Sequence, residues 1–360
     1  MLPAPTYVKV LDMLNKLKKD IDKSLRSLLS DITGVLALRS SSAVLYESIE
    51  DYLGRDGKRI RPILFLLSYL GYTEKKRPSY KKLVRCSLAL ELLHDFLLIH
   101  DDIIDGSAQR RGKPALHRVF NTRFGMPSGN ALGPNLGIVA GDIIFALAVE
   151  TLLSVDEDPC RKELALKIFT RAAAATGIGE FIDVINNIKK IDSVTEKDVF
   201  LTYVMKTAKY TFEAPLVMGA TLAGSGGKEL GALSRLGILL GQAFQIQDDL
   251  LDVFSTSKKI GKPVLSDLNE SKKTLLVWNA YKNLKGPGRK ALKGLLEKKK
   301  KTYADLLKFR KLIKTSGADE YCREKAASLF RESTAICSGL RMKERYKTAL
   351  ARFICDLAGK

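Results

Sequence analysis

Apolar residues recur at intervals of three, four and seven positions through most of the chain, with polar residues between them. Two of the clearest runs are Leu88, Leu92, Ile99 and Ile103 and, farther along, Leu236, Leu239, Leu240, Phe244 and Leu251. A period near 3.6 residues places the members of each run on one face of an α-helix. Alternating apolar and polar runs bounded by hairpin turns, which would indicate paired strands, are not convincing anywhere. The pattern predicts an all-α protein.

The predicted helices are interrupted where Gly, Pro and Asn gather, and we expect loops there. These places are residues 54–57, 71–78, 125–137, 156–159, 224–227, 258–269 and 286–288. None is long enough, or biased enough in composition, to act as a linker between independent domains. We therefore expect a single domain over residues 1–360, folded as one large helical bundle.

The composition is that of a folded protein, because hydrophobic residues make up 46% of the chain and charged residues 28%. The five cysteines are scattered and show no CxxC spacing, which predicts neither a disulfide framework nor a zinc site. A reducing cytoplasm is the expected location. Residues 1–20 are typical of an amphipathic helix rather than a signal peptide. No uncharged apolar run approaches the ~20 residues of a membrane span, so none is predicted.

The chain carries 60 Lys and Arg against 40 Asp and Glu, a net charge of +20 that favours anionic partners. Much of this excess lies between Lys285 and Lys314, around the run Lys298–Lys301. The segment lacks interleaved aromatic residues and a nucleic-acid fold signature, so specific nucleic-acid binding is not predicted. We interpret it first as a solvated basic face, and peripheral membrane contact stays open as the alternative.

The sequence Asp101-Asp102-Ile103-Ile104-Asp105 lies in a strongly apolar helical run. On a helix, Asp101 and Asp105 are one turn apart, and Asp102 lies beside them. Such crowding is repulsive, and burial would raise the carboxyl pKa values, so a cation is needed. Carboxylates with room for water and phosphate are typical ligands of Mg²⁺. One such cluster alone could still be a solvated acidic helix end.

A second cluster, Asp248-Asp249-Leu250-Leu251-Asp252, repeats the spacing in another apolar helix. Two such helices facing each other in a bundle would bring six carboxylates around one cavity. We expect that cavity to hold a diphosphate and more than one magnesium ion. The expected metal ligands are Asp101, Asp105, Asp248, Asp249 and Asp252.

These two clusters, with the motifs that flank them, resemble the trans-polyprenyl diphosphate synthase family, which includes the farnesyl and geranylgeranyl diphosphate synthases. The resemblance runs from about Arg55 to Thr274, and the motifs occur in the family's order. It implies an isoprenoid-synthase-type bundle with a central active-site cavity, a magnesium-dependent prenyltransferase activity and a homodimer. Its substrates would be isopentenyl diphosphate and allylic diphosphates. The motif-bearing core is then about residues 55–275, with peripheral helices over 276–360.

The segment Gly57-Lys58-Arg59-Ile60-Arg61-Pro62 resembles the family's GKRxRP motif, which holds the diphosphate of isopentenyl diphosphate. Gly57 would let the backbone approach the anion, Lys58 offers a point charge, and Arg61 offers a planar fork. A surface basic turn is the alternative. His94 lies seven residues before Asp101 on the same helix face, and the resemblance implies that it contacts isopentenyl diphosphate too.

Arg110-Arg111-Gly112 resembles the family's RRG motif, in which the first arginine binds the allylic diphosphate and the second binds isopentenyl diphosphate. A solvated basic loop is the alternative for this pair. Lys206 and Thr207 resemble the KT pair that holds the allylic diphosphate and helps it to leave.

Three further substrate-binding residues are implied around the second cluster. They are Gln245, just before it, and Lys262 and Lys272 after it. Residues 267–274 resemble a DLxEGKxT element in which Ser271 replaces the glycine. This departure puts the backbone path at Lys272 in doubt, so Lys272 ranks below Lys262.

The mechanism implied is ionisation of the allylic diphosphate, followed by attack of the isopentenyl double bond and loss of a proton, for which the released pyrophosphate is the expected acceptor. Its catalytic residues would be Asp101, Asp102, Asp105, Lys206 and Asp248, and the apolar helices around them would exclude water from the cation. Arg110 and Lys262 would assist departure of the pyrophosphate.

Product length should depend on the side chains one turn before the first cluster. Phe96 lies five residues before Asp101 and Leu97 lies four before it. A single aromatic at the earlier position resembles one type of geranylgeranyl synthase, which favours a twenty-carbon product. Simple core packing of Phe96 is the alternative, as are a farnesyl or a longer-chain product. A terpene cyclase would not need the GKRIRP and RRG motifs, and a non-catalytic subunit would usually have lost carboxylates.

Overall fold

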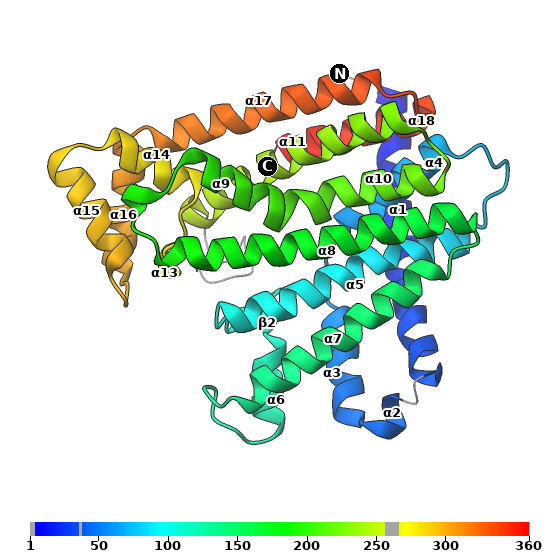
Figure 1. The fold of residues 1–360 in the computed structure, drawn as a ribbon, viewed down its shortest axis with the longest axis horizontal. Coiled ribbons are helices and arrows are strands. Elements are labelled where there is room, and N and C mark those ends of the chain that lie inside the picture. The colour runs from blue at the N-terminus through cyan, green and yellow to red at the C-terminus, as the bar shows by residue number, and fades with distance from the viewer. Residues whose placement is uncertain (1–3, 36–37, 256–265, 360) are drawn as a thin grey trace. The chain divides into compact units, whose positions relative to one another are not determined.

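The computed structural model describes residues 4–35, 38–255 and 266–359, and nearly all of its regular structure is helical (Figure 1). The all-α prediction is confirmed. The helices are α1 (Ala4–Val35), α2 (Leu38–Ser41), α3 (Ala43–Leu53), α4 (Ile60–Tyr72), α5 (Tyr80–Ile104), α6 (Leu116–Arg123), α7 (Leu132–Leu153), α8 (Pro159–Ile188), η1 (Ile191–Ser193), α9 (Glu196–Thr202), η2 (Tyr203–Glu213), α10 (Ala214–Leu222), α11 (Gly227–Phe254), α13 (Ser266–Asn269), α14 (Leu275–Asn283), α15 (Gly286–Glu297), α16 (Tyr303–Thr315), α17 (Ala318–Gly339) and α18 (Glu344–Ala358). Within the described ranges the strands are β1 (Gln109–Arg110) and β2 (Lys113–Pro114).

The chain divides into two compact units, each described by itself below. Unit 1 takes in the described residues of Met1–Thr170, Pro215–Gly231 and Arg341–Leu350. Unit 2 takes in those of Arg171–Ala214, Ala232–Leu340 and Ala351–Lys360. The helices α8, α11 and α18 each have residues in both units. A single domain over residues 1–360 stays a prediction.

Unit 1 is centred on α5, which packs against α7 (Figure 1). Three glycines of α7, spaced by four residues, line this contact and the contact with α6. A Cβ at Gly133 would lie 2.1 Å from the His117 carbonyl oxygen, and one at Gly141 would lie 2.5 Å from His100 Nε2. The predicted loop over 125–137 was therefore too long, because α7 begins at Leu132 and uses its glycines for close helix packing.

By length and composition, α7 could cross a membrane, and it is the one helix in the described ranges that passes this test. The prediction of no membrane span was based on uncharged apolar runs, and α7 is not such a run because Asp142 lies in its middle. Its glycine face packs against α5 and α6, which is the behaviour of a core helix. Its outer face exposes Ile138, Val139 and Leu153.

In unit 2, the π-helix η2 runs in close contact with α11 and α8. A Cβ at Gly241 of α11 would lie 2.2 Å from Ala208, and one at Gly179 of α8 would lie 2.3 Å from the Lys206 backbone nitrogen. Because Gly179 and Gly241 have no side chain, α8 and α11 can approach the segment that carries Lys206 and Thr207. A π-helical stretch inside helical structure often marks a functional site.

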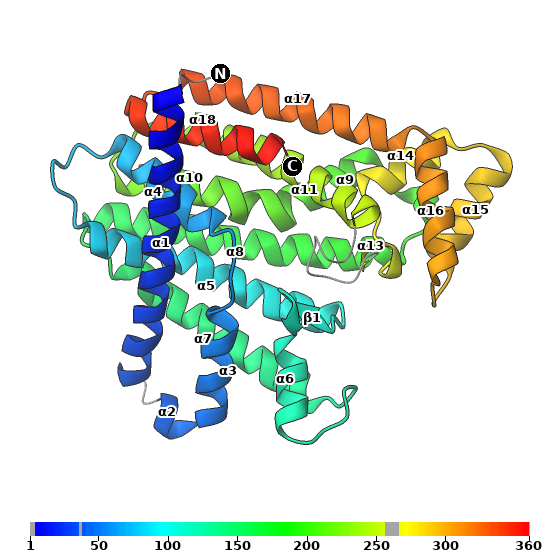
Figure 2. The same cartoon turned by 180° about the vertical axis from the view of Figure 1, so that it is seen from behind.

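The last part of unit 2 contains α14, α15, α16 and α17, which lie beside one another (Figure 2). The predicted loop at 286–288 is instead the first turn of α15. Pro287 lies at the beginning of this helix, where its missing N–H costs nothing and its fixed φ suits the first turn. Leu292, Leu295 and Leu296 form the buried face of α15.

Candidate active site

The first aspartate cluster lies at the C-terminal end of α5. Asp101 and Asp102 belong to its last turn, and Asp105 is the C-cap residue. Asp102 is buried, whereas Asp101 and Asp105 are half-exposed. The helix dipole places partial negative charge at this end, so three carboxylates there need cationic compensation. Part of that compensation comes from the chain itself.

A short hairpin directs two arginines toward α5. Strands β1 and β2 pair antiparallel with Arg110 opposite Lys113, and the two turn residues are Arg111 and Gly112. Both turn residues have positive φ values, 55° for Arg111 and 73° for Gly112, as the favoured two-residue hairpin turn requires. Glycine adopts such a φ freely, but arginine does so only when its surroundings hold it there.

Arg110 balances the first cluster. Its Nε lies 2.8 Å and its Nη2 lies 2.5 Å from the same Asp102 oxygen, and Nη2 lies 3.0 Å from Asp101. Burial alone would lower the pKa of Arg110, but Asp102 and Asp101 outweigh it and raise that pKa above its ordinary value. Arg110 is therefore permanently charged. Its guanidinium contacts both Asp101 and the buried Asp102.

Arg111 and Arg59 meet a second pair of acids on α5 that the sequence analysis did not single out. Arg111 Nη2 lies 3.2 Å from Asp95, and Arg59 Nη1 lies 2.5 Å from Glu91. Arg59 also donates to Asp22 at 2.8 Å. Glu91 and Asp95 lie one turn apart in an apolar helix, a spacing that could have identified them.

Burial raises the pKa of the Asp95 carboxyl to about 7, because desolvation and Glu91 together outweigh the attraction of Arg111. For Arg59, desolvation is outweighed by Glu91 and Asp22, which raise its pKa. Arg59 has a φ of 50°, so a strained backbone position in the GKRIRP motif is held by these carboxylates. Arg59 therefore positions this loop, a role that the sequence alone did not suggest.

The predicted isopentenyl diphosphate ligands all lie in unit 1. Lys58 is exposed and Arg61 is buried at the start of α4. The Gly57 N–H donates to Asp56 at 2.8 Å. Desolvation, reinforced by Arg61 and Arg111, lowers the pKa of His94 well below its usual value, so its imidazole is neutral near pH 7. A neutral imidazole can donate one hydrogen bond to a phosphate oxygen.

The proposed chain-length residue Phe96 faces α7. Its ring centroid lies 5.1 Å from that of Phe145 and 4.6 Å from that of His100. Phe145 in turn stacks on Phe169 at 6.2 Å. Leu97 is half-buried on the same helix. An aromatic row therefore begins at Phe96, and Phe145 is a member that the sequence analysis missed.

The second aspartate cluster, in unit 2, meets neutral hydrogen-bond donors. Asp248 is exposed, whereas Asp249 and Asp252 are buried. Asp249 accepts hydrogen bonds from the Tyr203 hydroxyl and, at 2.9 Å, from the Gln245 amide. The Thr207 hydroxyl donates to Gln245 Oε1 at 2.8 Å.

Three predicted residues, Thr207, Gln245 and Asp249, are thus joined by hydrogen bonds. Tyr203 also accepts from the Leu275 N–H at 2.8 Å, which ties this network to α14. Desolvation and then Asp249 raise the pKa of the Tyr203 hydroxyl well above its usual value. Tyr203 is therefore a proton donor at any ordinary pH.

Lys206 lies between two acids of α8. Its Nζ lies 2.6 Å from Glu180 and 2.9 Å from Asp183. The sequence signal for these partners is a Glu-x-x-Asp spacing directly after Gly179, whose lack of a side chain lets η2 approach. The lysine predicted to bind an allylic diphosphate is therefore held in place by two carboxylates.

The loop before α14 follows a glycine-like path even though Ser271 replaces the glycine. Ser271 has a φ of 59°, and its hydroxyl donates to the Leu296 carbonyl at 2.6 Å. Lys272 pairs with Glu270 at 2.7 Å. The positive φ expected of a glycine is therefore kept at Ser271, and the role of Lys272 stays a prediction. Lys262 lies outside the described residues.

Lys273, the neighbour of Lys272, is buried and donates to the Asn187 and Ser271 carbonyl oxygens at 2.9 and 2.7 Å. Desolvation, reinforced by the nearby Lys301, lowers its pKa to about 8. Carbonyl oxygens thus hold a lysine that the sequence analysis did not consider.

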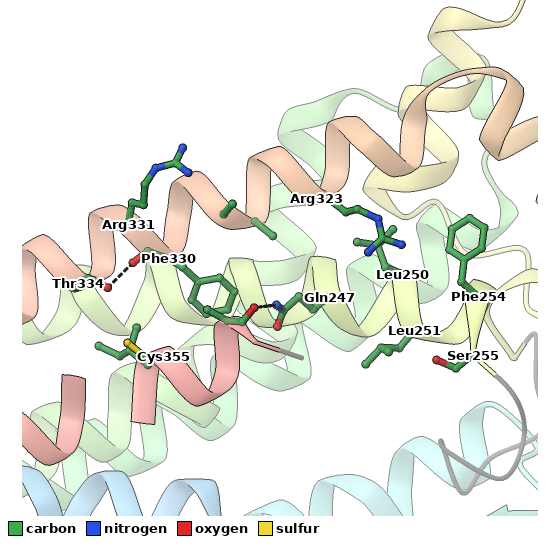
Figure 3. A pocket seen from close by; sticks show the side chains of 14 residues that line it. Gln247, Leu250, Leu251, Phe254, Ser255, Arg323, Phe330, Arg331, Thr334 and Cys355 are labelled. Carbon is green, nitrogen blue, oxygen red and sulfur yellow. Dashed lines mark hydrogen bonds between the residues drawn. The ribbon is translucent and has the colours of Figure 1, made fainter. Parts of the chain in front are cut away.

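A cavity of about 720 Å³ lies in unit 2 between α11, α17 and α18 (Figure 3). From α11 it is lined by Gln247, Leu250, Leu251 and Phe254. These positions lie on the face of the helix opposite to Asp248, Asp249 and Asp252, because residues at i, i+3, i+4 and i+7 share one side. The cavity is therefore separate from the carboxylates.

The two clusters suit a hard cation that keeps some water. In the described ranges, no three His, Cys, Asp or Glu side chains are grouped as a complete metal site. Mg²⁺ needs fewer protein ligands, since it is held by one or two carboxylates together with waters and substrate phosphates. In unit 1, Asp101 and Asp105 offer half-exposed carboxylates one turn apart, and in unit 2 Asp248 offers an exposed one. The carboxylates of each cluster therefore suit magnesium bound with a diphosphate.

The family model described as polyprenyl synthetase matches residues 42–313. The chain belongs to the polyprenyl synthetase family. It is accordingly an enzyme of the prenyltransferase class, as the sequence motifs predicted. The curated short chain isoprenyl diphosphate synthase of Methanocaldococcus jannaschii is 33% identical over 255 residues, covering 71% of this chain and 72% of that protein. Other matching relatives are named as geranylgeranyl, farnesyl and geranylfarnesyl diphosphate synthases.

Solved structures of family members agree with the fold. The geranylgeranyl pyrophosphate synthetase of Pyrococcus horikoshii has a TM-score of 0.81 and 28% identity, covering 98% of this chain and 99% of that one. A geranylgeranyl pyrophosphate synthase from Corynebacterium glutamicum, complexed with isoprenyl diphosphate and magnesium, has a TM-score of 0.85 at 23% identity, covering 96% and 99%. The isoprenoid-synthase type of fold is therefore confirmed.

Proposed function

We propose that this polyprenyl synthetase family member condenses isopentenyl diphosphate with allylic diphosphates in the trans configuration, releases pyrophosphate and makes a short-chain product. The single observation that carries the proposal is the arrangement around the first aspartate cluster. There, Asp101 and Asp105 are half-exposed carboxylates that suit a metal, and Arg61, His94 and Arg111 lie around Asp95, earlier on the same helix, with Lys58 exposed three residues before Arg61. A diphosphate-ionising enzyme with one substrate needs only the carboxylates. The additional basic set fits a second diphosphate.

The basic set in unit 1 would hold isopentenyl diphosphate. Arg61 and Arg111 carry planar forks suited to phosphate oxygens, and Lys58 is exposed. His94, neutral near pH 7, would add a hydrogen bond without a charge. Arg59 and Asp95 would act through their neighbours, since Arg59 holds the loop and Asp95 holds Arg111. These residues would bind and orient the acceptor but would not react.

The allylic diphosphate would be bound by Arg110 in unit 1 and by Lys206, Thr207 and Gln245 in unit 2. Magnesium, held by Asp101, Asp105 and Asp248, would supply positive charge where the leaving pyrophosphate becomes more negative. Lys206 would be kept charged and oriented by Glu180 and Asp183. The Thr207–Gln245–Asp249 hydrogen bonds would fix the hydroxyl that faces the diphosphate. A shared cavity for both clusters stays a prediction, and so does the role of Lys262.

We also propose a twenty-carbon product. The aromatic row of Phe96 and Phe145 supports this, because a growing prenyl tail that descends from Asp101 along α5 would meet two packed rings. Names of matching relatives span fifteen-, twenty- and twenty-five-carbon products, so product length needs its own test. We expect Phe96→Ala to lengthen the products and Phe145→Ala to lengthen them further. Phe169→Leu is the control, because Phe169 is the next ring of the row, behind Phe145.

We further propose a cytoplasmic homodimer. In unit 2, α8 exposes an apolar stripe that includes Phe181, 69% exposed, and Ile188, 80% exposed. In unit 1, α7 exposes Ile138 and Val139. Several large apolar side chains exposed on one helix are typical of protein–protein contact. Sedimentation of the chain and of Phe181→Asp/Ile188→Asp would test this, since the variant should become monomeric.

One incubation tests the proposed reaction. The purified chain, Mg²⁺, labelled isopentenyl diphosphate and each allylic starter in turn should give labelled prenyl diphosphates, and omission of Mg²⁺ should abolish them. Chain-length analysis of these products tests the twenty-carbon proposal. Release of pyrophosphate from an allylic starter without incorporation of label would instead favour a terpene cyclase and overturn the proposal.

A further inference from the structure

The Lys-rich segment 285–314 has no role in the proposed reaction. It carries twelve Lys and Arg and two acidic residues, so it supplies half of the net charge of +20. Some of these side chains make contacts within the protein and others do not. Lys293 pairs with Asp192 at 2.5 Å and Lys298 with Asp305 at 2.6 Å. Lys301 donates to Ser271 Oγ at 3.0 Å.

Six other lysines of the segment are exposed, and their side chains make no ion pair, hydrogen bond or aromatic-ring contact with any residue that the structure describes. They are Lys285, Lys290, Lys299, Lys300, Lys308 and Lys311. The fold therefore uses part of the basic segment for its own contacts and leaves the rest facing solvent. A positive surface of this kind attracts anions and costs the protein some self-repulsion.

The exposed face of α16 adds apolar side chains to this charge. Tyr303 is 71% exposed and Leu307 is 49% exposed. Positions 303, 307 and 311 follow one another at intervals of one turn, so these two side chains and Lys311 form a single stripe. The opposite face of α16 buries Leu306, Phe309 and Ile313 in unit 2. The helix is thus anchored on one side and presents tyrosine, leucine and lysines on the other.

We propose that the α16 patch, defined as Lys299, Lys300, Tyr303, Leu307, Lys308 and Lys311, docks this protein reversibly on an anionic lipid surface. Each lysine near such a surface adds electrostatic attraction. Tyrosine suits the level of the lipid headgroups, and leucine can insert into the acyl boundary. Two apolar side chains are too few for stable insertion, so attraction by the lysines carries most of the binding.

A nucleic acid is the less favoured partner for the same patch. Binding of single strands uses rows of aromatic side chains on which successive bases stack, together with arginine contacts. The α16 patch offers one tyrosine, no arginine and an aliphatic side chain beside it. Leucine exposed between lysines gains nothing from a phosphate backbone, whereas it gains from an acyl boundary. The lipid surface therefore explains every member of the patch.

Flotation of the full chain with vesicles tests the proposal. It should bind vesicles of phosphatidylcholine with phosphatidylglycerol, and should not bind vesicles of phosphatidylcholine alone. K299Q/K300Q/K308Q/K311Q should weaken binding on the order of 100-fold or more, from the attraction lost with four lysines. Y303S/L307S should weaken it roughly tenfold.

The matched control is K9Q/K16Q/K19Q/K23Q, which removes the same charge from four exposed lysines of α1. It should bind vesicles like the unmodified chain. Equal weakening in both quadruple variants would overturn the proposal, since the attraction would then belong to the whole protein. Loss of single-stranded RNA binding in the patch variant, with vesicle binding intact, would overturn it in favour of nucleic acid. Unchanged melting curves would show that each variant folds.

Discussion

The two aspartate clusters share one spacing but have different surroundings. In unit 1, the guanidinium of Arg110 lies within 3.0 Å of both Asp101 and Asp102. In unit 2, Asp249 accepts hydrogen bonds from neutral groups, the Tyr203 hydroxyl and the Gln245 amide. Asp101 and Asp102 are thus partly neutralised by Arg110, whereas Tyr203 and Gln245 orient Asp249.

Among the basic groups, Lys206 in unit 2 is held by carboxylates, as Arg59 and Arg110 are in unit 1, but Lys273 is not. Carboxylates hold Arg59 and Arg110 in unit 1 and raise their pKa values. Backbone carbonyls hold Lys273 in unit 2, and its pKa is lowered to about 8. Paired charges in unit 1 imply that removal of one partner chiefly affects folding. In unit 2, removal of an exposed carboxylate should affect metal binding and activity instead. The predictions below test this contrast.

The largest expected effect is on activity, at the second cluster. Asp248→Asn should reduce turnover on the order of 100- to 1,000-fold, because an accessible ligand for the metal that assists the leaving group is lost. The Mg²⁺ concentration for half-maximal activity should rise. Because Asp248 is exposed, the free energy of unfolding should change by less than about 0.5 kcal/mol.

Steady-state kinetics over a magnesium titration and urea unfolding together check this prediction. Glu332→Gln, which neutralises an exposed acid of α17, is the matched control and should change neither quantity. If Asp248→Asn lowered stability as much as turnover, the second cluster would be structural and the contrast between the clusters would fail.

At the first cluster the expected effect is on folding. Arg110→Gln should lower the free energy of unfolding by about 3–5 kcal/mol, because Asp102 would stay buried without its cation. Asp102→Asn/Arg110→Gln should recover most of this loss, since no unpaired charge remains. Urea unfolding without metal or substrate measures both. A double variant as unstable as the single one would mean that the cost lies in lost packing rather than in the buried carboxylate.

The sequence predicted the local parts of this site well. Spacings within one helix, such as Asp101 to Asp105 or Asp248 to Asp252, depend only on helical periodicity and can be read without a fold. The hairpin that carries Arg110 was not predicted, although Gly112 suits a turn with positive φ. The all-α architecture follows from the same periodicity repeated along the chain.

Long-range partners could not be predicted in this way. Within GKRIRP, nothing local distinguishes Arg59 from Lys58, yet Arg59 turns inward to Glu91, 32 residues away. Lys206 finds Asp183 23 residues away, at a contact that exists because Gly179 lets η2 approach α8. Tertiary packing decides which of several similar side chains is held by carboxylates and which is left exposed.

A pH experiment tests the contrast between paired and carbonyl-held basic groups. The pKa of Lys273 is lowered from 10.5 to about 8 in the folded protein. Between these two values the unfolded chain keeps the proton that the folded protein has lost, so stability should rise with pH. Below about pH 8 the full cost of burying the charge is present. That cost is on the order of 3 kcal/mol, from the difference between the two pKa values.

Urea unfolding of the native chain and of Lys273→Met from pH 7.5 to 10.5 provides the measurement. Subtracting one profile from the other removes the contribution of the tyrosines and cysteines that titrate in the same range. The native chain should gain stability relative to Lys273→Met as the pH rises. If the difference in unfolding free energy stayed constant, Lys273 would be charged throughout this pH range. Carbonyl oxygens would then stabilise its charge as well as carboxylates do.

The smallest effect concerns the strained loop of unit 2, where Ser271 takes a glycine-like φ of 59°. Arg59 and Arg111 in unit 1 are held in such conformations by carboxylates, whereas the Ser271 hydroxyl donates to the Leu296 carbonyl and accepts from Lys301. Ser271→Gly relieves about 1 kcal/mol of strain and loses these two hydrogen bonds, each worth about 1 kcal/mol, so the unfolding free energy should fall by about 1 kcal/mol. Ser271→Ala loses the same bonds, keeps the strain and should be about 1 kcal/mol less stable than the glycine variant. Urea unfolding of the pair resolves this difference, and equal stabilities would mean that the loop backbone relaxes without the serine hydroxyl.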